Sequence, residues 1–260
     1  MRHKPIDKEK HKQMMDEVKE LLIEVMTNIE KMNGKGAVAY GSLLGLVREK
    51  QLIEYDSDGD IIVDYETYLM LKEKYPNRII DTENSKNPYI IPKWVKENYD
   101  LKNRYEPSID IFVLAKTTLH RYKNWVHDPK IGLRIYKTMT NRDYYFRKKT
   151  YYKIAKIFFK LIFWLKDYSV TEAIEYLEKN IKHATLGIVL HKHKFNKKVL
   201  RDDTILDPND LNDLGYIELD GHKLLTFKNP IKYLEHWYGL NWKKPIKCKR
   251  SNYYGLFELY

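Results

Sequence analysis

Three aspartates at alternate positions, Asp56, Asp58 and Asp60, are the residues whose types and spacing are best suited to chemistry. They lead into an apolar, β-branched run at residues 61–63. On a strand, side chains two residues apart point to the same face about 6.5 to 7 Å apart, so these carboxylates would repel one another. A divalent cation removes that repulsion, because hard ions such as Mg²⁺ take oxygen ligands and are usually held by one or two carboxylates with phosphates and water.

A glycine and a serine precede the aspartates and could contact the phosphates of a ligand. The apolar run that begins at Val38 ends in Gly41-Ser42, and a short amphipathic piece then ends at Arg48. A turn at Gly41-Ser42 would bring backbone N–H groups close to phosphate. Arg48 would offer a two-pronged contact to a phosphate or fix the aspartates. The alternative for Arg48 is a surface ion pair with Glu49 or Glu54.

The Asp-x-Asp-x-Asp pattern also occurs in other kinds of site. A calcium-binding EF-hand loop needs a glycine after the third aspartate and a glutamate at position twelve, and Ile61 and Thr67 stand there instead, which excludes it. The Asp-x-Asp of a glycosyltransferase stays open as an alternative, although the upstream Gly-Ser-Leu-Leu-Gly block argues against it. A solvated acidic turn is the remaining alternative.

These segments together resemble the LicD/fukutin family of phosphotransferases. The family pattern is Gly-Thr/Ser-Leu-Leu-Gly-x-x-Arg, a connector and an Asp-rich cluster, and residues 41–48 and 55–61 are similar to it. Residues 109–112, Ile-Asp-Ile-Phe, are similar to a third acid-bearing strand, and residues 227–245 are similar to the family's C-terminal motifs. The sequence departs from the pattern at Tyr55, Ser57 and Gly59, where most members have a Trp, an acid and a hydrophobic residue.

The resemblance implies an α+β fold of the nucleotidyltransferase (polymerase beta) type, a mixed sheet flanked by helices, with a basic and mostly helical second subdomain. It implies that three carboxylates are catalytic and hold Mg²⁺ or Mn²⁺, namely Asp58, Asp60 and Asp110. It also implies that the donor is bound by Gly41, Ser42 and Arg48. We expect Asp110 to accept the proton of the attacking hydroxyl.

The implied reaction moves a phosphorylated alcohol, of the phosphocholine or polyol-phosphate type, from a CDP-activated donor to a glycan hydroxyl and releases CMP. The acceptor would be a glycan or a lipid-linked glycan, such as a cell-surface polysaccharide. Two alternatives stay open. One is a nucleotidyltransferase that moves NMP from an NTP to a small molecule or RNA and releases pyrophosphate, and the other is a non-catalytic polyanion-binding module.

Composition narrows the class of protein. With 260 residues and 43% hydrophobic content, the chain can bury a sizeable core. A single cysteine, Cys248, excludes an internal disulfide and a cysteine-based zinc site and favours a reducing compartment. Without a signal-peptide pattern or an apolar run of about 18 residues, we expect a cytoplasmic protein that is either soluble or peripheral on the cytoplasmic face of a membrane.

Positive charge is concentrated in one segment. Residues 116–166 contain fourteen Lys or Arg and two Asp, a local excess of +12 in a chain whose net charge is +11. Such a segment attracts polyanions. Within it, residues 148–166 predict a helix rich in lysine and apolar side chains, for which we favour a buried helix with lysine stems reaching outward. An in-plane helix on an anionic membrane is the second hypothesis, and nucleic-acid binding is less favoured.

Periodicity and turn residues predict the other elements. We expect helices at 7–32, 43–49, 65–75 and 171–183 and from Pro230 to Tyr238, strands at 37–40, 58–63 and 109–114, and a hairpin at 216–227. Residues 84–107 predict a loop with a short strand at 89–91. His191 and His193 lack a third ligand, so no metal site is expected there. We place a catalytic core with its N-terminal helix at 1–115, and a basic helical subdomain at 116–260 whose C-terminal hairpin and helix pack back on the core.

Overall fold

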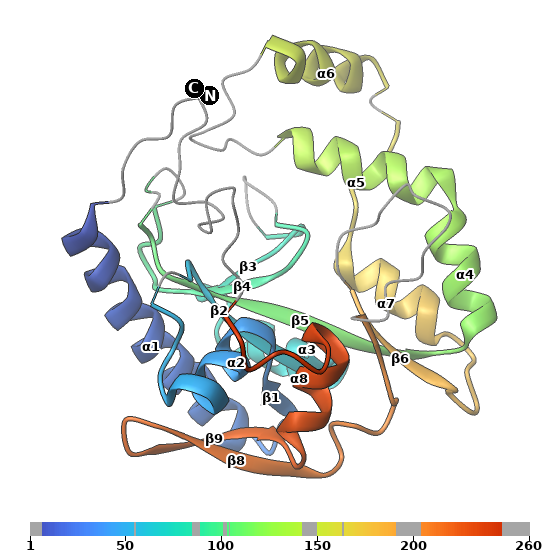
Figure 1. The fold of residues 1–260 in the computed structure, drawn as a ribbon. Coiled ribbons are helices and arrows are strands. Elements are labelled where there is room, and N and C mark those ends of the chain that lie inside the picture. Colours follow the sequence, from blue (N-terminus) through green and yellow to red (C-terminus); the bar gives the residue numbers. More distant parts are fainter. Residues whose placement is uncertain are drawn as a thin grey trace.

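A mixed β-sheet crosses the centre of the protein, with helices on both of its faces (Figure 1). The computed structural model describes residues 7–54, 56–84, 89–100, 103, 105–141, 150–162, 164–190 and 204–245. The predictions for Tyr55, for His191 and His193 and for Cys248 lie outside these residues. The expected α+β class, a mixed sheet flanked by helices, is confirmed.

The strand order of the sheet is β1-β2-β5-β4-β3, and β6 and β7 extend it alongside the second half of β5. Its strands are β1 (Gly36–Val38), β2 (Gly59–Asp64), β3 (Ile79–Ile80), β4 (Lys93–Val95), β5 (Ser108–Thr117), β6 (Leu186–Val189) and β7 (Ile205–Leu206). A separate hairpin consists of β8 (Leu214–Leu219) and β9 (His222–Phe227). β6 and β7, which come after residue 115, belong to the same sheet as β1. The division of the chain into two subdomains at residue 115 stays a prediction.

Eight helices lie in the described residues. They are α1 (Lys8–Lys31), α2 (Tyr40–Glu49), α3 (Tyr65–Lys74), α4 (Leu119–His127), α5 (Pro129–Asn141), α6 (Thr150–Leu161), α7 (Val170–Glu178) and α8 (Pro230–Tyr238). None of these is long and apolar enough to cross a bilayer. The stripe predicted for residues 7–32 is confirmed, because α1 buries its apolar positions from Met14 to Ile29 after an N-cap by Asp7, which accepts from Lys10 N.

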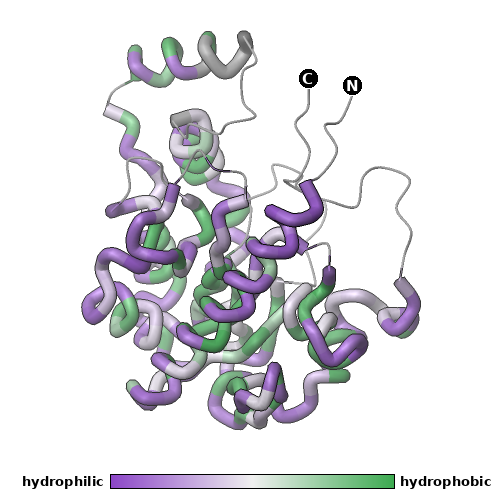
Figure 2. Tube along the Cα trace, turned by 90° about the vertical axis from the view of Figure 1, so that its left-hand side faces the viewer, coloured by the Kyte–Doolittle hydropathy of each residue, from purple (hydrophilic) through white to green (hydrophobic). Residues whose placement is uncertain are grey.

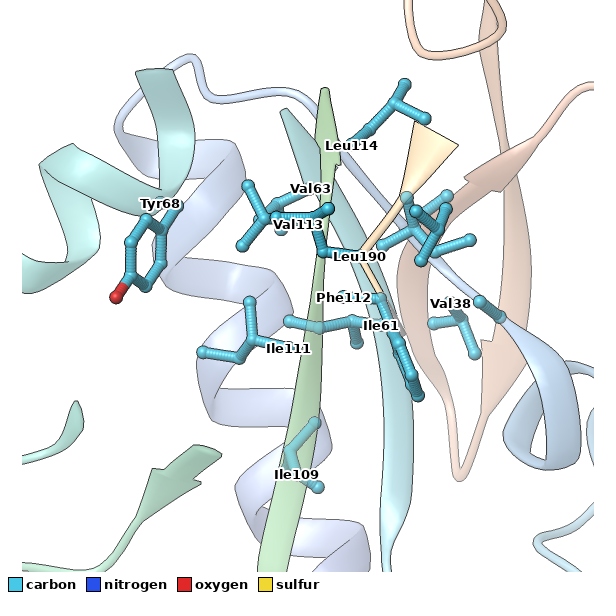
Figure 3. Close-up of a cluster of buried hydrophobic side chains, with 14 of the residues drawn as sticks. Val38, Ile61, Val63, Tyr68, Ile109, Ile111, Phe112, Val113, Leu114 and Leu190 are labelled. Atoms are coloured by element: carbon cyan, nitrogen blue, oxygen red, sulfur yellow. The ribbon is translucent and has the colours of Figure 1, made fainter. Parts of the chain in front are cut away.

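The pairing of β2 with β5 determines which side chains face which helices. The two strands are parallel, with Ile61 opposite Ile111 and Asp60 opposite Asp110. Figure 3 shows Ile111 and Val113 pointing toward α1 and Tyr68 of α3, whereas Phe112 points the other way. Because side chains alternate along a strand, Asp60 and Asp110 lie on the face of Phe112, opposite α1.

Three predicted boundaries are wrong for local reasons. Residues 41 and 42 lie in the first turn of α2 instead of in a turn before it. The short strand lies at 93–95 instead of 89–91, because Trp94 pairs with Ile109 of β5 and is fully buried. The helix expected to reach residue 183 ends at Glu178, since Asn180 adopts a left-handed conformation (φ 58°). The sequence patterns also missed β3.

The C-terminal hairpin and helix are confirmed. Asp220 and Gly221 both have positive φ (49° and 79°), as a two-residue hairpin turn requires. Asn229 caps α8 by accepting from Lys232 N at 3.3 Å, and Pro230 takes the first helical position. Thr226 of β9 donates to Val38 O at 3.3 Å, so the hairpin packs on the edge strand of the sheet.

The prediction that the basic helix is buried is wrong for the described part of α6. Ile154, Ile157, Phe158 and Leu161 are each more than half exposed, whereas Phe159 is buried. The pattern correctly predicted a helix here, but the helix packs on the protein through one side only.

Candidate active site

Sheet register brings two of the predicted acids together. Asp60 of β2 lies directly opposite Asp110 of β5, and Lys93 of β4 lies opposite Asp110 on the other side. Residues in register on neighbouring strands point to the same face, so the three side chains form one row across the sheet. Asp58 immediately precedes β2, and its side chain lies 3.8 Å from Lys93 Nζ. The structure therefore brings together Asp58, Asp60 and Asp110, as the sequence predicts.

Lys93 was not identified from the sequence. Its ammonium group forms an ion pair with Asp110 Oδ1, and both side chains are 13% exposed. The ring of Tyr89 lies 5.4 Å from Lys93 Nζ. The available signal was a lysine beside the apolar pair Trp94-Val95, and it becomes meaningful only once β4 is placed against β5.

The N-terminus of α2 orients Asp60. Gly41 N donates to Asp60 Oδ2 at 3.0 Å, and Asp60 N donates to Ser42 Oγ at 2.9 Å. A Cβ atom on residue 41 would lie 2.5 Å from Asp56 Oδ2 and 3.1 Å from Asp60 Oδ2, so only glycine allows this approach. Gly41 and Ser42 thus contact an acid of the site in this structure.

Asp56 is the fourth member of a group that we call the acid cluster: Asp56, Asp58, Asp60 and Asp110. Its Oδ1 accepts from Ser57 N at 3.0 Å, and its Oδ2 is the oxygen nearest to Gly41. The connector that carries it is tied to α1, where His11 Nε2 lies 2.5 Å from Glu54 O. Gly45 permits the same connector to pass close to α2, because a Cβ there would lie 2.6 Å from Gln51 O.

Burial and mutual repulsion raise the pKa values of three of these acids. Burial, followed by the charge of Asp110, raises the pKa of Asp58 to about 8. Burial raises the pKa of Asp56 to about 6, and burial and the charge of Asp58 raise the pKa of Asp60 well above its usual range. Burial alone would lower the pKa of Lys93, but Asp110 and Asp58 raise it. The charge of Lys93 acts to lower the pKa of Asp58, but burial and the neighbouring carboxylates outweigh it.

Arg48 lies apart from this row. Its Nε donates to Glu49 Oε1 at 2.9 Å, and the two side chains form an ion pair. The structure thus brings Arg48 to Glu49, as in the alternative given for this residue, and does not bring it to the aspartates.

Aromatic side chains connect the C-terminal motif to the site. Tyr40, the first residue of α2, has a positive φ of 42°, which is strained for a tyrosine. Its ring lies 4.4 Å from that of Trp237 in α8 and 4.8 Å from that of Phe112 in β5. These contacts hold the start of α2 against the sheet, and so help to position Gly41 beside Asp60.

The chemistry of the acid cluster fits a hard divalent cation. Its ligand atoms are carboxylate oxygens, the atoms that such a cation prefers, and they lie close enough together that, in addition to burial, neighbouring carboxylates raise the pKa values of Asp58 and Asp60. No group of three or more ligating side chains in the described residues has the spacing of a formed metal site. In this structure the ammonium group of Lys93 lies beside Asp58 and Asp110.

Comparison with known proteins gives one family. The model of the family described as LicD/FKTN/FKRP, nucleotidyltransferase domain, matches residues 37–160. The matched segment begins in β1, includes α2, the acid cluster and Lys93, and ends in α6. No curated protein shows significant similarity to the chain.

Proposed function

The chain belongs to the LicD/FKTN/FKRP family through residues 37–160, and on this premise we propose that it is a metal-dependent transferase that modifies glycans. It moves a phosphorylated alcohol, of the phosphocholine or polyol-phosphate type, from a CDP-activated donor to a glycan hydroxyl. The acceptor oxygen forms the new bond to the phosphorus that carries the alcohol. The bond from that phosphorus to the CMP oxygen breaks, and CMP leaves.

The observation that carries the proposal is the row of side chains across β2, β5 and β4. Regular strands hold Asp60 and Asp110 side by side, and Asp58 joins them at the start of β2. Such rigid placement suits phosphoryl transfer, because positioning and charge stabilisation supply nearly all of its catalysis. We also propose that the sheet belongs to the nucleotidyltransferase type.

Asp58, Asp60 and Asp110 would hold Mg²⁺ or Mn²⁺, as the resemblance implies. When bound, the ion neutralises negative charge on the diphosphate of the donor. The side chains then have separate tasks. Asp110 accepts the proton of the attacking hydroxyl. Gly41 and Ser42 keep Asp60 in its orientation through their two hydrogen bonds.

Lys93 has a role in the proposed reaction as well. A lysine ammonium is a compact charge that binds phosphate oxygens as well as carboxylates. Because Lys93 Nζ contacts Asp110 and lies 3.8 Å from Asp58, it is within reach of a phosphate that approaches these acids. We propose that it contacts the transferred phosphoryl group.

Two alternatives use the same residues differently. A nucleotidyltransferase would move NMP from an NTP and release pyrophosphate, so the identity of the released product separates it from the proposed reaction. A polyanion-binding module would depend on the basic residues in 116–166 and would keep its binding when Asp58 is replaced by alanine.

Thermal-shift screening tests the proposal. The panel contains CDP-choline, CDP-ribitol, CDP-glycerol, UDP-sugars and NTPs, each with and without Mg²⁺, because a ligand that binds only the folded protein raises its melting temperature. We expect a CDP-alcohol to stabilise the protein only with Mg²⁺, and to yield CMP once a glycan acceptor is added. Stabilisation by NTPs alone, with pyrophosphate release, would replace the proposal by the first alternative.

A further inference from the structure

One helix exposes a continuous apolar surface. Ile154, Ile157, Phe158 and Leu161 of α6 are 63%, 61%, 51% and 67% exposed, and we call these four residues the α6 stripe. Their spacing of three and four residues places them on one face of the helix. Trp164, three residues beyond the stripe, is 70% exposed. Single exposed apolar residues are ordinary, but a contiguous patch of them marks an interaction site.

The opposite side of α6 packs on the protein. Phe159 is buried, and its ring lies 5.7 Å from that of Tyr136 in α5. The exposed side chains of the α6 stripe therefore lie on the side of the helix that faces away from α5. The helix itself lies at the upper edge of the molecule in Figure 1. Figure 2 shows hydrophobic and hydrophilic residues alternating along this helix, as in an amphipathic helix. Its length of 12 residues is too short to span a bilayer.

Positive charge lies on one side of the stripe. Lys160 is exposed and borders the stripe beside Ile157, Lys156 lies one turn earlier and is half-buried, and the side chain of Lys166 is 80% exposed. These lysines belong to the segment 116–166, whose excess charge is +12. An apolar face bordered by lysines complements the surface of a bilayer that contains anionic lipids.

We propose that α6 binds in the plane of an anionic membrane, with the α6 stripe and Trp164 in the acyl-chain boundary and the neighbouring lysines at the lipid phosphates. A nucleic acid would use the lysines but leave the stripe exposed to water. A second copy of the chain would bring two segments of the same strong charge together, which is unfavourable. This proposal does not depend on the proposed function, since it concerns binding and not turnover.

Vesicle co-sedimentation with the full chain tests the proposal. Vesicles of pure phosphatidylcholine are compared with vesicles that contain about 30% phosphatidylglycerol. We expect at least about tenfold tighter binding to the anionic vesicles, a large loss of binding in the double variant Ile157→Glu/Phe158→Glu, and a partial loss in Lys156→Glu/Lys160→Glu. The control is Leu240→Glu, because Leu240 is 83% exposed and lies beyond α8, outside the basic segment.

Fluorescence gives a second readout. On anionic vesicles we expect a blue shift of the tryptophan emission that disappears in Trp164→Phe, and circular dichroism shows whether each variant is folded. Three results would overturn the proposal. These are equal binding to both vesicle types, binding that the stripe variant retains, and a protein dimer that the stripe variant converts to a monomer, which would assign the surface to a second copy.

Discussion

In the acid cluster, four partly buried carboxylates lie close together, whereas on α6 four apolar side chains lie exposed at the edge of the molecule. Each arrangement costs free energy in the isolated protein. Clustered carboxylates lose hydration and repel one another, and exposed apolar side chains are in contact with water. This cost is consistent with the two proposals, which place a cation and phosphates at the acid cluster and lipid at the α6 stripe.

The two regions also differ in what holds them. The acid cluster stands on strands whose register is continuous from β2 through β5 to β4, with α2 hydrogen-bonded to Asp60. The described contacts of α6 are made mainly with α5, through Phe159 and Tyr136. Substitutions in the acid cluster should thus change both turnover and stability, whereas those on α6 should change only association.

The largest effect is expected from removing one carboxylate of the acid cluster. Asp58→Asn or Asp60→Asn should lower turnover by about 10³-fold, since several kcal/mol of charge stabilisation are lost. The measurement is CMP release from a CDP-alcohol. Asp16→Asn, at an exposed position of α1, serves as the control and should keep normal turnover. Full turnover in both cluster variants would show that these acids are not the active site.

Removing Lys93 should lower stability as well as turnover, and the effect on stability is the one that reports on the cation. In Lys93→Met the ion pair with Asp110 is lost, and the free energy of unfolding should fall by about 3 kcal/mol in EDTA. Mg²⁺ should recover much of this loss, because a bound cation replaces the missing positive charge. The measurement is urea unfolding with and without Mg²⁺.

Lys228→Met is the control for Lys93, because Lys228 forms an ion pair with Asp213 in which the two side chains are 70% and 69% exposed. It should cost about 1 kcal/mol or less, with no dependence on Mg²⁺. If Mg²⁺ changed the stability of the two variants equally, Lys93 would not lie at the cation site.

A smaller effect is expected from Gly41→Ala. The added Cβ would lie 2.5 Å from Asp56 Oδ2, so the start of α2 must shift, at a cost of about 1 to 3 kcal/mol. Turnover should fall by about tenfold as Asp60 loses its orientation. Adding Asp56→Ala to this variant should restore part of the stability, because the closest contact is then removed. Additive losses in the double variant would contradict this contact.

The last expected effect is a dependence of stability on pH. In the folded protein the pKa of Asp56 is about 6 and that of Asp58 is about 8, whereas the ordinary value is 3.8. Between pH 3.8 and about pH 8 the folded state therefore binds more protons than the unfolded state. Stability without metal should therefore be fully present below about pH 4 for these groups and decrease as pH rises to about 8. Mg²⁺ should reduce the decrease. Thermal unfolding at several pH values in EDTA and in Mg²⁺ measures it.

Sequence patterns were informative where structure is local. The spacing of Asp56, Asp58 and Asp60, the stripe of α1 and the turn at Asp220-Gly221 each depend on residues close in the chain. The α+β class and the family followed from such segments.

Features that depend on distant contacts could not be found in this way. Lys93 reaches Asp110, 17 residues further along the chain, because β4 pairs with β5. The helical start at Tyr40 depends on Trp237, near the other end of the chain. The exposure of Ile157 and Phe158 is decided by which side of α6 meets α5, and periodicity alone does not give that side.

Binding of Mn²⁺, followed by electron paramagnetic resonance, tests the central claim most directly, because it reports on the acid cluster without requiring the correct donor or acceptor. The account predicts that the unmodified protein binds Mn²⁺ in competition with Mg²⁺, that Asp60→Asn loses this binding, and that Asp16→Asn keeps it. Equal binding by the unmodified protein and Asp60→Asn, both verified as folded, would contradict the assignment of a cation to Asp58, Asp60 and Asp110.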